Sequence, residues 1–191
     1  MAKHSSAGKT QQGFTLIEIL TVLFVVGFIV GGVSVFFNLK SPDEELKKTV
    51  EKFSVIANHI SELSILSGEP IGLKLEPPEW RDDPLEQGWR YSWQKLTGEG
   101  FVELTDVPAV EIDNAIELNV FIDEQEWKYE DAPEVREPIL YFYSTGEVTP
   151  FEIEFVHDEV FEQTQTVMVD VWGEVVWKER QEQREQEEAF N

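Results

Sequence analysis

The feature that most constrains this chain is an apolar run near its N-terminus, at residues 14–37. Its 24 residues, FTLIEILTVLFVVGFIVGGVSVFF, contain one charged side chain, Glu18, and no lysine or arginine. As an α-helix the run would be ~36 Å long, enough to cross a hydrocarbon core of ~30 Å. We therefore expect a membrane-spanning helix that contains an acid.

A carboxylate inside the bilayer costs about 2.5–3.5 kcal/mol on insertion scales, so an acid in such a helix normally has a partner group. The simplest explanation is that Glu18 lies near the end of the run and extends to the headgroups. The sequence before the run points to another explanation.

Residues 1–13 are polar, carry two lysines and end in Gly13. A secretory signal would have an apolar stretch of about 7–15 residues followed by a small-residue cleavage site, and no Ala-x-Ala follows Phe37. The string GFTLIE, from Gly13 to Glu18, instead resembles the prepilin signature shared by type IV pilins and the pseudopilins of type II secretion. The resemblance covers the leader and the whole apolar helix.

The resemblance implies three site residues. A membrane prepilin peptidase cuts after Gly13, and the new N-terminal residue, Phe14, is methylated. Glu18 becomes the fifth mature residue, and its carboxylate meets the N-terminal amine of a neighbouring subunit as the filament grows. We therefore expect residues 1–13 to be a cleaved leader and residues 14–37 to be a transmembrane and assembly helix.

Charge indicates where the remainder lies. Removing the leader takes the formal net charge from −23 to −25, which leaves no basic patch for nucleic acid. The leader is the basic flank and acids follow soon after the run, at residues 43–45, so the positive-inside rule predicts that the large domain lies outside the cytoplasm. In a Gram-negative host this describes a single-pass inner-membrane protein with a periplasmic C-terminal domain. The chain has no cysteine, but about 150 residues can bury a core without disulfides.

The string SPDE at residues 41–44 predicts the start of a second helix, with Ser41 as N-cap, proline at the first helical position and acids in the first turn. Apolar residues then recur at steps of four and three, which favours a helix that lies along a sheet. This stripe consists of Leu46, Val50, Phe53, Ala57 and Ile60. Ser67 and Gly68 end the helix. The resemblance implies that both helical segments form one long N-terminal helix.

From Ile71 onward, short β-rich runs alternate with proline, glycine and acidic clusters, and several of them alternate apolar with polar residues. The predicted strands are 71–75, 89–96, 101–104, 115–121, 139–143, 151–156, 166–171 and 174–177. We expect surface loops at 76–88 and 123–138, and a charged, mobile tail at 178–191. Residues 38–177 are then the head.

These elements predict an α+β, pilin-like fold, in which a long N-terminal helix, half membrane-bound and half amphipathic, packs on an antiparallel β-sheet head. Two further strings are GWRYSWQKL at 88–96 and YFYSTGEVTPFEIEF at 141–155, followed by a glycine-containing turn at 172–174. They resemble the H-type minor pseudopilins of type II secretion, with Gly146 in the turn between two late strands. The chain length suits an H-type or a J-type protein.

The resemblance implies a structural subunit near the tip of the type II secretion pseudopilus, which supports export of folded proteins across the outer membrane. Its implied partners are the I-, J- and K-type minor pseudopilins, the major pseudopilin, the prepilin peptidase and inner-membrane lipid. The alternative is a minor pilin of a type IV pilus. Acidity argues against a DNA-uptake pilin, and the lack of cysteine argues weakly against pilus minor pilins, which often carry a disulfide. A plain anchored domain would leave Gly13, Phe14 and Glu18 as coincidences.

Catalytic or metal chemistry has little support in the sequence, which contains no nucleophile elbow or phosphate loop. The cluster at 157–159 begins with His157, but adjacent side chains on a strand point to opposite faces, so we interpret it as a surface histidine. Acidic loops at 82–83 and 123–126 lack the spaced, glycine-containing ligands of a calcium loop. We expect no enzyme activity, no cofactor and no bound calcium.

Overall fold

The computed structural model describes residues 16–37, 41–81, 88–160, 163–170 and 173–190, with backbone alone at 29–37. The chain divides into two compact units, Met1–Lys40 and Ser41–Asn191. The second unit is the head, which therefore begins at Ser41 rather than at residue 38. The expected continuity of the two helices into one falls at residues 38–40, outside the described residues.

The first unit contains the helix α1 (Leu16–Phe37), which forms from the apolar run. It is apolar on every side rather than amphipathic, and its described side chains, at 16–28, are exposed within the unit. A helix that is apolar all round is normally covered by lipid or by protein. Within the described part of the chain, no helix combines the length and the apolar character needed to cross a membrane.

The head begins with the helix α2 (Pro42–Ser67), and both of its predicted ends are confirmed. Ser41 is the N-cap residue, but its hydroxyl makes no capping hydrogen bond; its carbonyl instead accepts the N–H of Glu45 at 3.0 Å. Gly68 ends the helix with φ = 73°, a left-handed conformation that glycine adopts without a Cβ clash.

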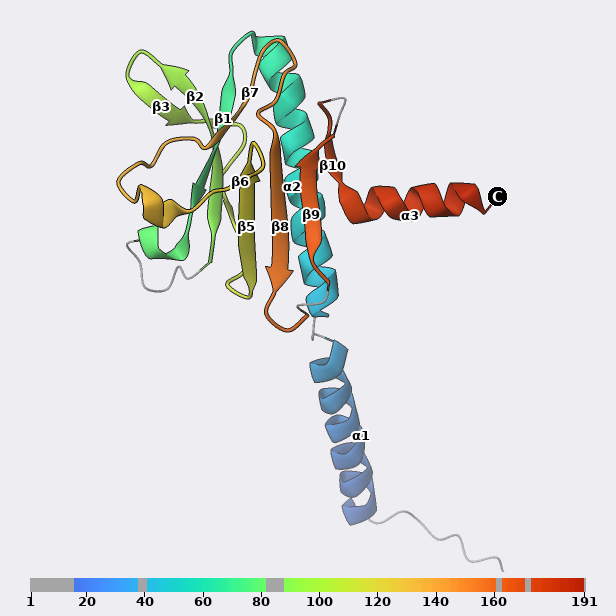
Figure 1. The fold of residues 1–191 in the computed structure, drawn as a ribbon. Helices are drawn as coiled ribbons and strands as arrows, with labels where there is room; N and C mark the ends of the chain where they lie inside the picture. The colour runs from blue at the N-terminus through green and yellow to red at the C-terminus, as the bar shows by residue number, and fades with distance from the viewer. Residues whose placement is uncertain (1–15, 38–40, 82–87, 161–162, 171–172, 191) are drawn as a thin grey trace, which may run out of the picture. The chain divides into compact units, whose positions relative to one another are not determined.

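The strands of the head form two antiparallel sheets (Figure 1). One sheet has the order β3-β2-β1-β7, with β4 also paired to β2, and the other has the order β10-β9-β8-β5-β6. The strands are β1 (Ile71–Glu76), β2 (Arg90–Thr97), β3 (Gly100–Glu103), β4 (Val110–Glu111), β5 (Ile116–Ile122), β6 (Gln125–Glu126), β7 (Leu140–Phe142), β8 (Phe151–His157), β9 (Gln165–Val169) and β10 (Val175–Trp177). Every predicted strand is present, with ends that differ by one or two residues, and β4 and β6 are additional.

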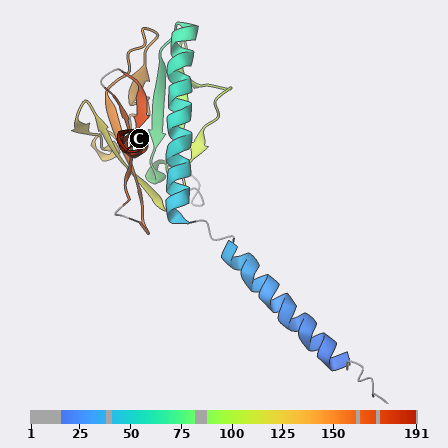
Figure 2. The same ribbon diagram turned by 90° about the vertical axis from the view of Figure 1, so that its right-hand side faces the viewer.

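The core lies where α2 packs against strands of both sheets, and Figure 2 shows the helix running along the length of the head. All five residues of the predicted apolar stripe are buried, which confirms the direction in which α2 faces. Phe53 is central, since its ring centroid lies 5.2 Å from that of Tyr91 in one sheet and 5.6 Å from that of Phe155 in the other. One helix thus supplies a common core to two sheets.

The predicted turn at Gly146 is confirmed between β7 and β8. Gly146 has φ = 88°, and its N–H donates to the carbonyl of Tyr143 at 3.0 Å. A side chain at this φ would be strained, so the turn depends on glycine.

The segment predicted as a mobile charged tail is instead the helix α3 (Lys178–Ala189), and this corrects the prediction. Its residues are glutamate, glutamine, arginine and lysine, all good helix formers, with no proline, glycine or β-branched residue before Ala189. The start of the helix is fixed to the head, because the Glu179 carboxylate accepts the Thr166 N–H of β9 at 2.8 Å. The prediction that the segment is charged and solvated holds, since no residue of α3 is buried.

The region predicted as a surface loop at 76–88 contains the short 3₁₀ turn η1 (Pro78–Trp80), and Trp80 is buried. An ion-pair network lies beside it: Arg90 contacts the carboxylates of Glu76 and Glu103, and Lys74 donates to Glu76 at 2.9 Å. Burial raises the pKa of the Glu76 carboxyl, but bonds and charge from Lys74 and Arg90 outweigh it, so that pKa lies below its ordinary value.

Candidate functional site

Two of the three predicted site residues, Gly13 and Phe14, lie outside the described residues. The third, Glu18, lies in the first turn of α1 with its side chain exposed. Apolar neighbours surround it on the same helix, and a shallow apolar hollow of about 440 Å³ is lined by Leu16, Ile19, Leu20 and Leu23. When lipid or protein covers this surface, the Glu18 carboxylate becomes a favourable partner for a cation in a low-dielectric environment.

His157 is not the surface histidine that the sequence suggested. Its side chain is buried, with the residue 4% exposed, at the end of β8 opposite Ile116. Its Nδ1 accepts the N–H of Glu159 at 3.1 Å and lies 3.1 Å from the Asp158 carboxylate. The ring packs beside β5 and accepts a backbone N–H in the turn that follows β8, so the position of His157 has a structural explanation.

The predicted acidic loops contain no metal-binding group in the part of the chain that the structure describes. Asp82 and Asp83 lie outside that part. Asp123 and Glu124 form the turn between β5 and β6, with φ of 50° and 64°. Two successive residues with positive φ are typical of a tight hairpin turn, which accounts for the acids there without an ion.

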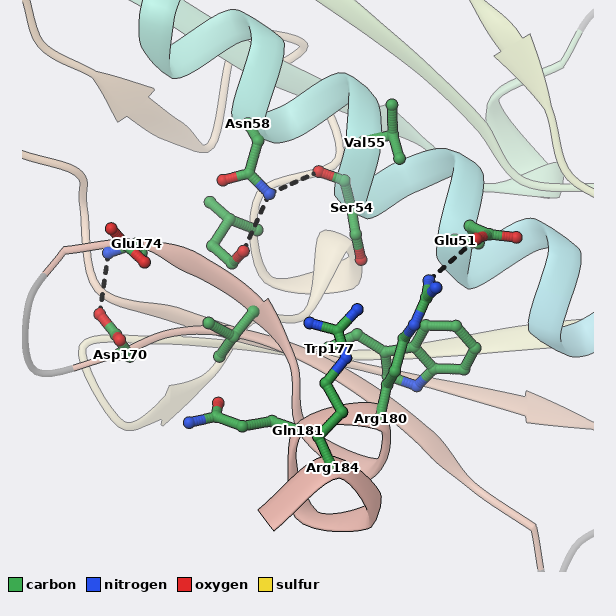
Figure 3. A pocket seen from close by; sticks show the side chains of 12 residues that line it. Glu51, Ser54, Val55, Asn58, Asp170, Glu174, Trp177, Arg180, Gln181 and Arg184 are labelled. Atoms are coloured by element: carbon green, nitrogen blue, oxygen red, sulfur yellow. Dashed lines mark hydrogen bonds and ion pairs between the residues drawn. The ribbon is translucent and has the colours of Figure 1, made fainter. Parts of the chain in front are cut away.

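The sequence did not predict a groove of about 360 Å³ on the head, between α2, β10 and α3 (Figure 3). Helix α2 supplies Glu51, Ser54 and Asn58, and α3 supplies Arg180 and Arg184. The turn from β9 to β10 supplies Asp170 and Glu174 at the other side of the groove. Sequence reasoning missed this groove because it treated the last 14 residues as detached from the fold.

Hydrogen bonds and one ion pair hold three walls of the groove together. The side-chain amide of Asn58 donates to the carbonyls of Ser54 and Val175, each at 2.9 Å, which ties β10 to α2. Arg180 contacts the Glu51 carboxylate at 2.8 Å and lies 5.6 Å from the Trp177 ring centroid, a cation–π distance. The sequence did contain one signal for the α3 side of the groove, because Arg180 and Arg184 are four residues apart and lie on the same face of a helix.

A second hollow of about 380 Å³ lies beside the two sheets, lined by Trp89, residues 117–120 of β5 and residues 126–130. The Trp89 indole N–H donates to the Glu117 carboxylate at 3.3 Å, and Tyr129 stands edge-on to both Trp80 and Trp89. Loss of hydration and the neighbouring Glu79 raise the pKa of Tyr129 to about 12, so it is a hydrogen-bonding phenol at neutral pH.

Comparisons with known proteins agree with this architecture. Residues 8–34 match the model of the prokaryotic N-terminal methylation motif. The chain is 29% identical to type II secretion system protein H of Aeromonas hydrophila over 92% of its own length and 97% of that protein. It is 24% identical to type II secretion system protein H of Klebsiella pneumoniae, over 75% of this chain and 85% of that protein.

Two solved structures of the minor pseudopilin EpsH, from the type II secretion system of Vibrio cholerae, share the fold. One has a TM-score of 0.54 at 22% identity and covers 72% of this chain and 95% of that one. The other has a TM-score of 0.51 at 20% identity and covers 70% and 95%. In its methylation motif and over nearly its whole length, the chain is therefore similar to protein H of the type II secretion system, and its head shares the fold of a solved minor pseudopilin.

Proposed function

We propose that this protein is a structural subunit placed near the tip of the type II secretion pseudopilus, anchored in the inner membrane by α1 with its head in the periplasm. The proposal rests on the observation that one chain contains two different units, a helix that is apolar on every side and a head with its own core. Such a helix needs cover from lipid before assembly and from neighbouring helices afterwards.

In this proposal the prepilin peptidase cuts after Gly13 and Phe14 is methylated. The Glu18 carboxylate then neutralises the N-terminal amine of a neighbouring pseudopilin. The pairing sets the register of the new subunit, because two opposite charges in a low-dielectric environment stabilise each other only at close approach. The partners are the major pseudopilin and the I-, J- and K-type minor pseudopilins.

The proposed role supports export of folded proteins and requires no chemistry from the protein itself. A minor pilin of a type IV pilus would have the same leader and helix. The full-length relatives at 29% and 24% identity are both type II secretion proteins, which favours the pseudopilus.

The test is the variant Glu18→Val, expressed in cells whose own copy of the gene is deleted. Insertion and cleavage should survive, because the leader is intact and the helix becomes more apolar. Crosslinking to partner pseudopilins in the membrane and secretion of folded enzymes should both fall. The matched control is Thr21→Val, since the Thr21 hydroxyl is satisfied within α1 by the Ile17 carbonyl at 2.8 Å. Normal crosslinking and secretion with Glu18→Val would refute the electrostatic role.

A further inference from the structure

The groove between α2, β10 and α3 contains two polar groups that the fold leaves unused. The Ser54 hydroxyl has no hydrogen-bond partner among the described residues, although Ser54 is only 9% exposed. Arg184 forms no hydrogen bond or ion pair with any residue that the structure describes. Figure 3 shows the Arg184 guanidinium extending from α3 into the groove, towards the side of α2 on which the Ser54 hydroxyl points.

Buried polar groups are normally satisfied, so the unpaired hydroxyl of the buried Ser54 indicates a missing acceptor, and the exposed Arg184 guanidinium could bind the same acceptor. A carboxylate suits both donors, because it accepts the planar donor pair of arginine and a hydroxyl O–H at the same time. Arg180 also lines the groove but is already paired with Glu51, so Arg184 is the arginine of the groove that is available to a ligand.

The other side of the groove limits the ligand to a single negative charge. Asp170 and Glu174 line that side, and the Asp170 carboxylate accepts the N–H of Glu174 at 2.8 Å. Two carboxylates within one groove repel a phosphate dianion or an anionic membrane, whereas they favour the N–H groups of a peptide chain. Val55, which is 64% exposed, adds an apolar contact at the edge.

We propose that this groove binds a glutamate or aspartate side chain presented by a neighbouring protein subunit, with its carboxylate between Arg184 and Ser54. The inference rests on the proposed function only for the source of that side chain, which is another pseudopilin in the assembly. The local donors carry it: at this side of the groove an acidic side chain meets the Arg184 guanidinium and the Ser54 hydroxyl, whereas most of the surface of a chain of formal net charge −23 repels acidic partners.

The test uses the full-length mature protein, labelled with ¹⁵N in detergent micelles, and the peptide acetyl-Ala-Val-Glu-Ala-amide. We expect saturable shifts in the NMR signals of the Arg184 Nε–H, the Asn58 amide and the Trp177 indole N–H. The same peptide with glutamine in place of glutamate should bind about tenfold more weakly, and added salt should weaken the glutamate peptide alone. Equal binding of the two peptides would overturn the proposal.

Substitutions at Arg184 and Ser54 test whether these two residues bind the peptide carboxylate. Arg184→Gln should lower affinity about tenfold, Arg184→Lys should lose less, and Ser54→Ala should lose a few-fold. The matched control is Arg136→Gln, because Arg136 is an arginine of the head that does not line the groove and lies 5.4 Å from the Trp80 centroid. It should leave binding unchanged. Wild-type affinity in Arg184→Gln would refute the site.

Two further probes separate the possible sources of the anion. Inorganic phosphate should bind more weakly than the glutamate peptide, and so should a peptide whose one carboxylate is its C-terminus. Preferential binding of either one would overturn the proposal. Because these measurements use the isolated protein, their failure would leave the Glu18 assembly test unaffected.

Discussion

The Phe53 ring joins α2 to both sheets, so its removal tests the architecture of the head directly. We consider Phe53→Ala in a fragment of residues 41–191, which contains the whole of the second unit and its core. The fragment should be soluble and folded, because the core residues that the structure describes in the head all lie at Leu46 or later.

The expected loss of unfolding free energy follows from how deeply Phe53 is buried and from the rings that it contacts. Phe53 is 1% exposed, and its ring meets those of Tyr91, Trp93 and Phe155 at centroid distances of 5.2, 6.2 and 5.6 Å. Phenylalanine-to-alanine changes in cores cost about 3–5 kcal/mol, and the upper half of that range applies where neighbours cannot close the cavity. Here the neighbours belong to two sheets and a helix, so we expect about 4–5 kcal/mol.

Urea unfolding of the fragment, followed by tryptophan fluorescence and far-UV circular dichroism, measures this free energy. For a domain of this size the loss corresponds to a fall in Tm of roughly 8–20 °C. The matched control is Val55→Ala on the same helix, because Val55 is 64% exposed and its truncation should change the free energy of unfolding by less than about 0.5 kcal/mol. A loss below about 1 kcal/mol for Phe53→Ala would refute the packing of α2 between the sheets.

Three further predictions concern other parts of the chain. Gly13→Leu should block processing, whereas intact-mass analysis of the wild-type protein should show a methylated N-terminus at Phe14; a mature N-terminus elsewhere would contradict the prepilin interpretation. The lowered pKa of Glu76 contributes stability that is complete above its unfolded value of 4.5 and is lost as pH falls through the folded pKa, so Glu76→Gln should flatten the acid limb of a urea-unfolding pH series. Gly146→Val should cost about 1–3 kcal/mol of unfolding free energy, because valine would be forced to φ = 88°; an unchanged urea midpoint would show that the turn relaxes.

The longer elements of the head were predictable because local chemistry and burial agree in them. In β8, the buried residues Phe151, Ile153 and Phe155 alternate with glutamates, so the period of two was evident. In α2, the proline start, the apolar stripe and Gly68 gave independent signals for the same helix. The two-residue strands β4 and β6 offered too few positions for any period to appear.

Features that depend on contacts between distant segments were not predictable. The division of the strands into two sheets is set by pairings such as β1 with β7, which join residues about 70 apart in sequence. Trp80 lies in a proline-rich acidic stretch, yet it is buried against Tyr129, which belongs to the second predicted loop. The buried position of His157 also requires β5, which pairs with β8 at Ile116.

The candidate site divides in the same way. Glu18 could be named as a candidate from the sequence because a single charge in an apolar run stands out, and its role stays a prediction. The groove could not, since Ser54, Arg180 and Arg184 belong to segments about 130 residues apart, joined by contacts such as Arg180 with Glu51. A charged segment was interpreted as a solvated tail because isolated charge usually indicates solvent exposure.

Charge also bears on why such a protein would be a minor subunit rather than the repeating unit of a filament. An apolar helix such as α1 offers little to distinguish one neighbour from another, because lipid and protein surfaces are similarly apolar. In the proposed assembly, the selection of neighbours would then rest on Glu18 and on the head. After removal of the leader the chain carries a formal net charge of −25, so two copies placed side by side repel each other.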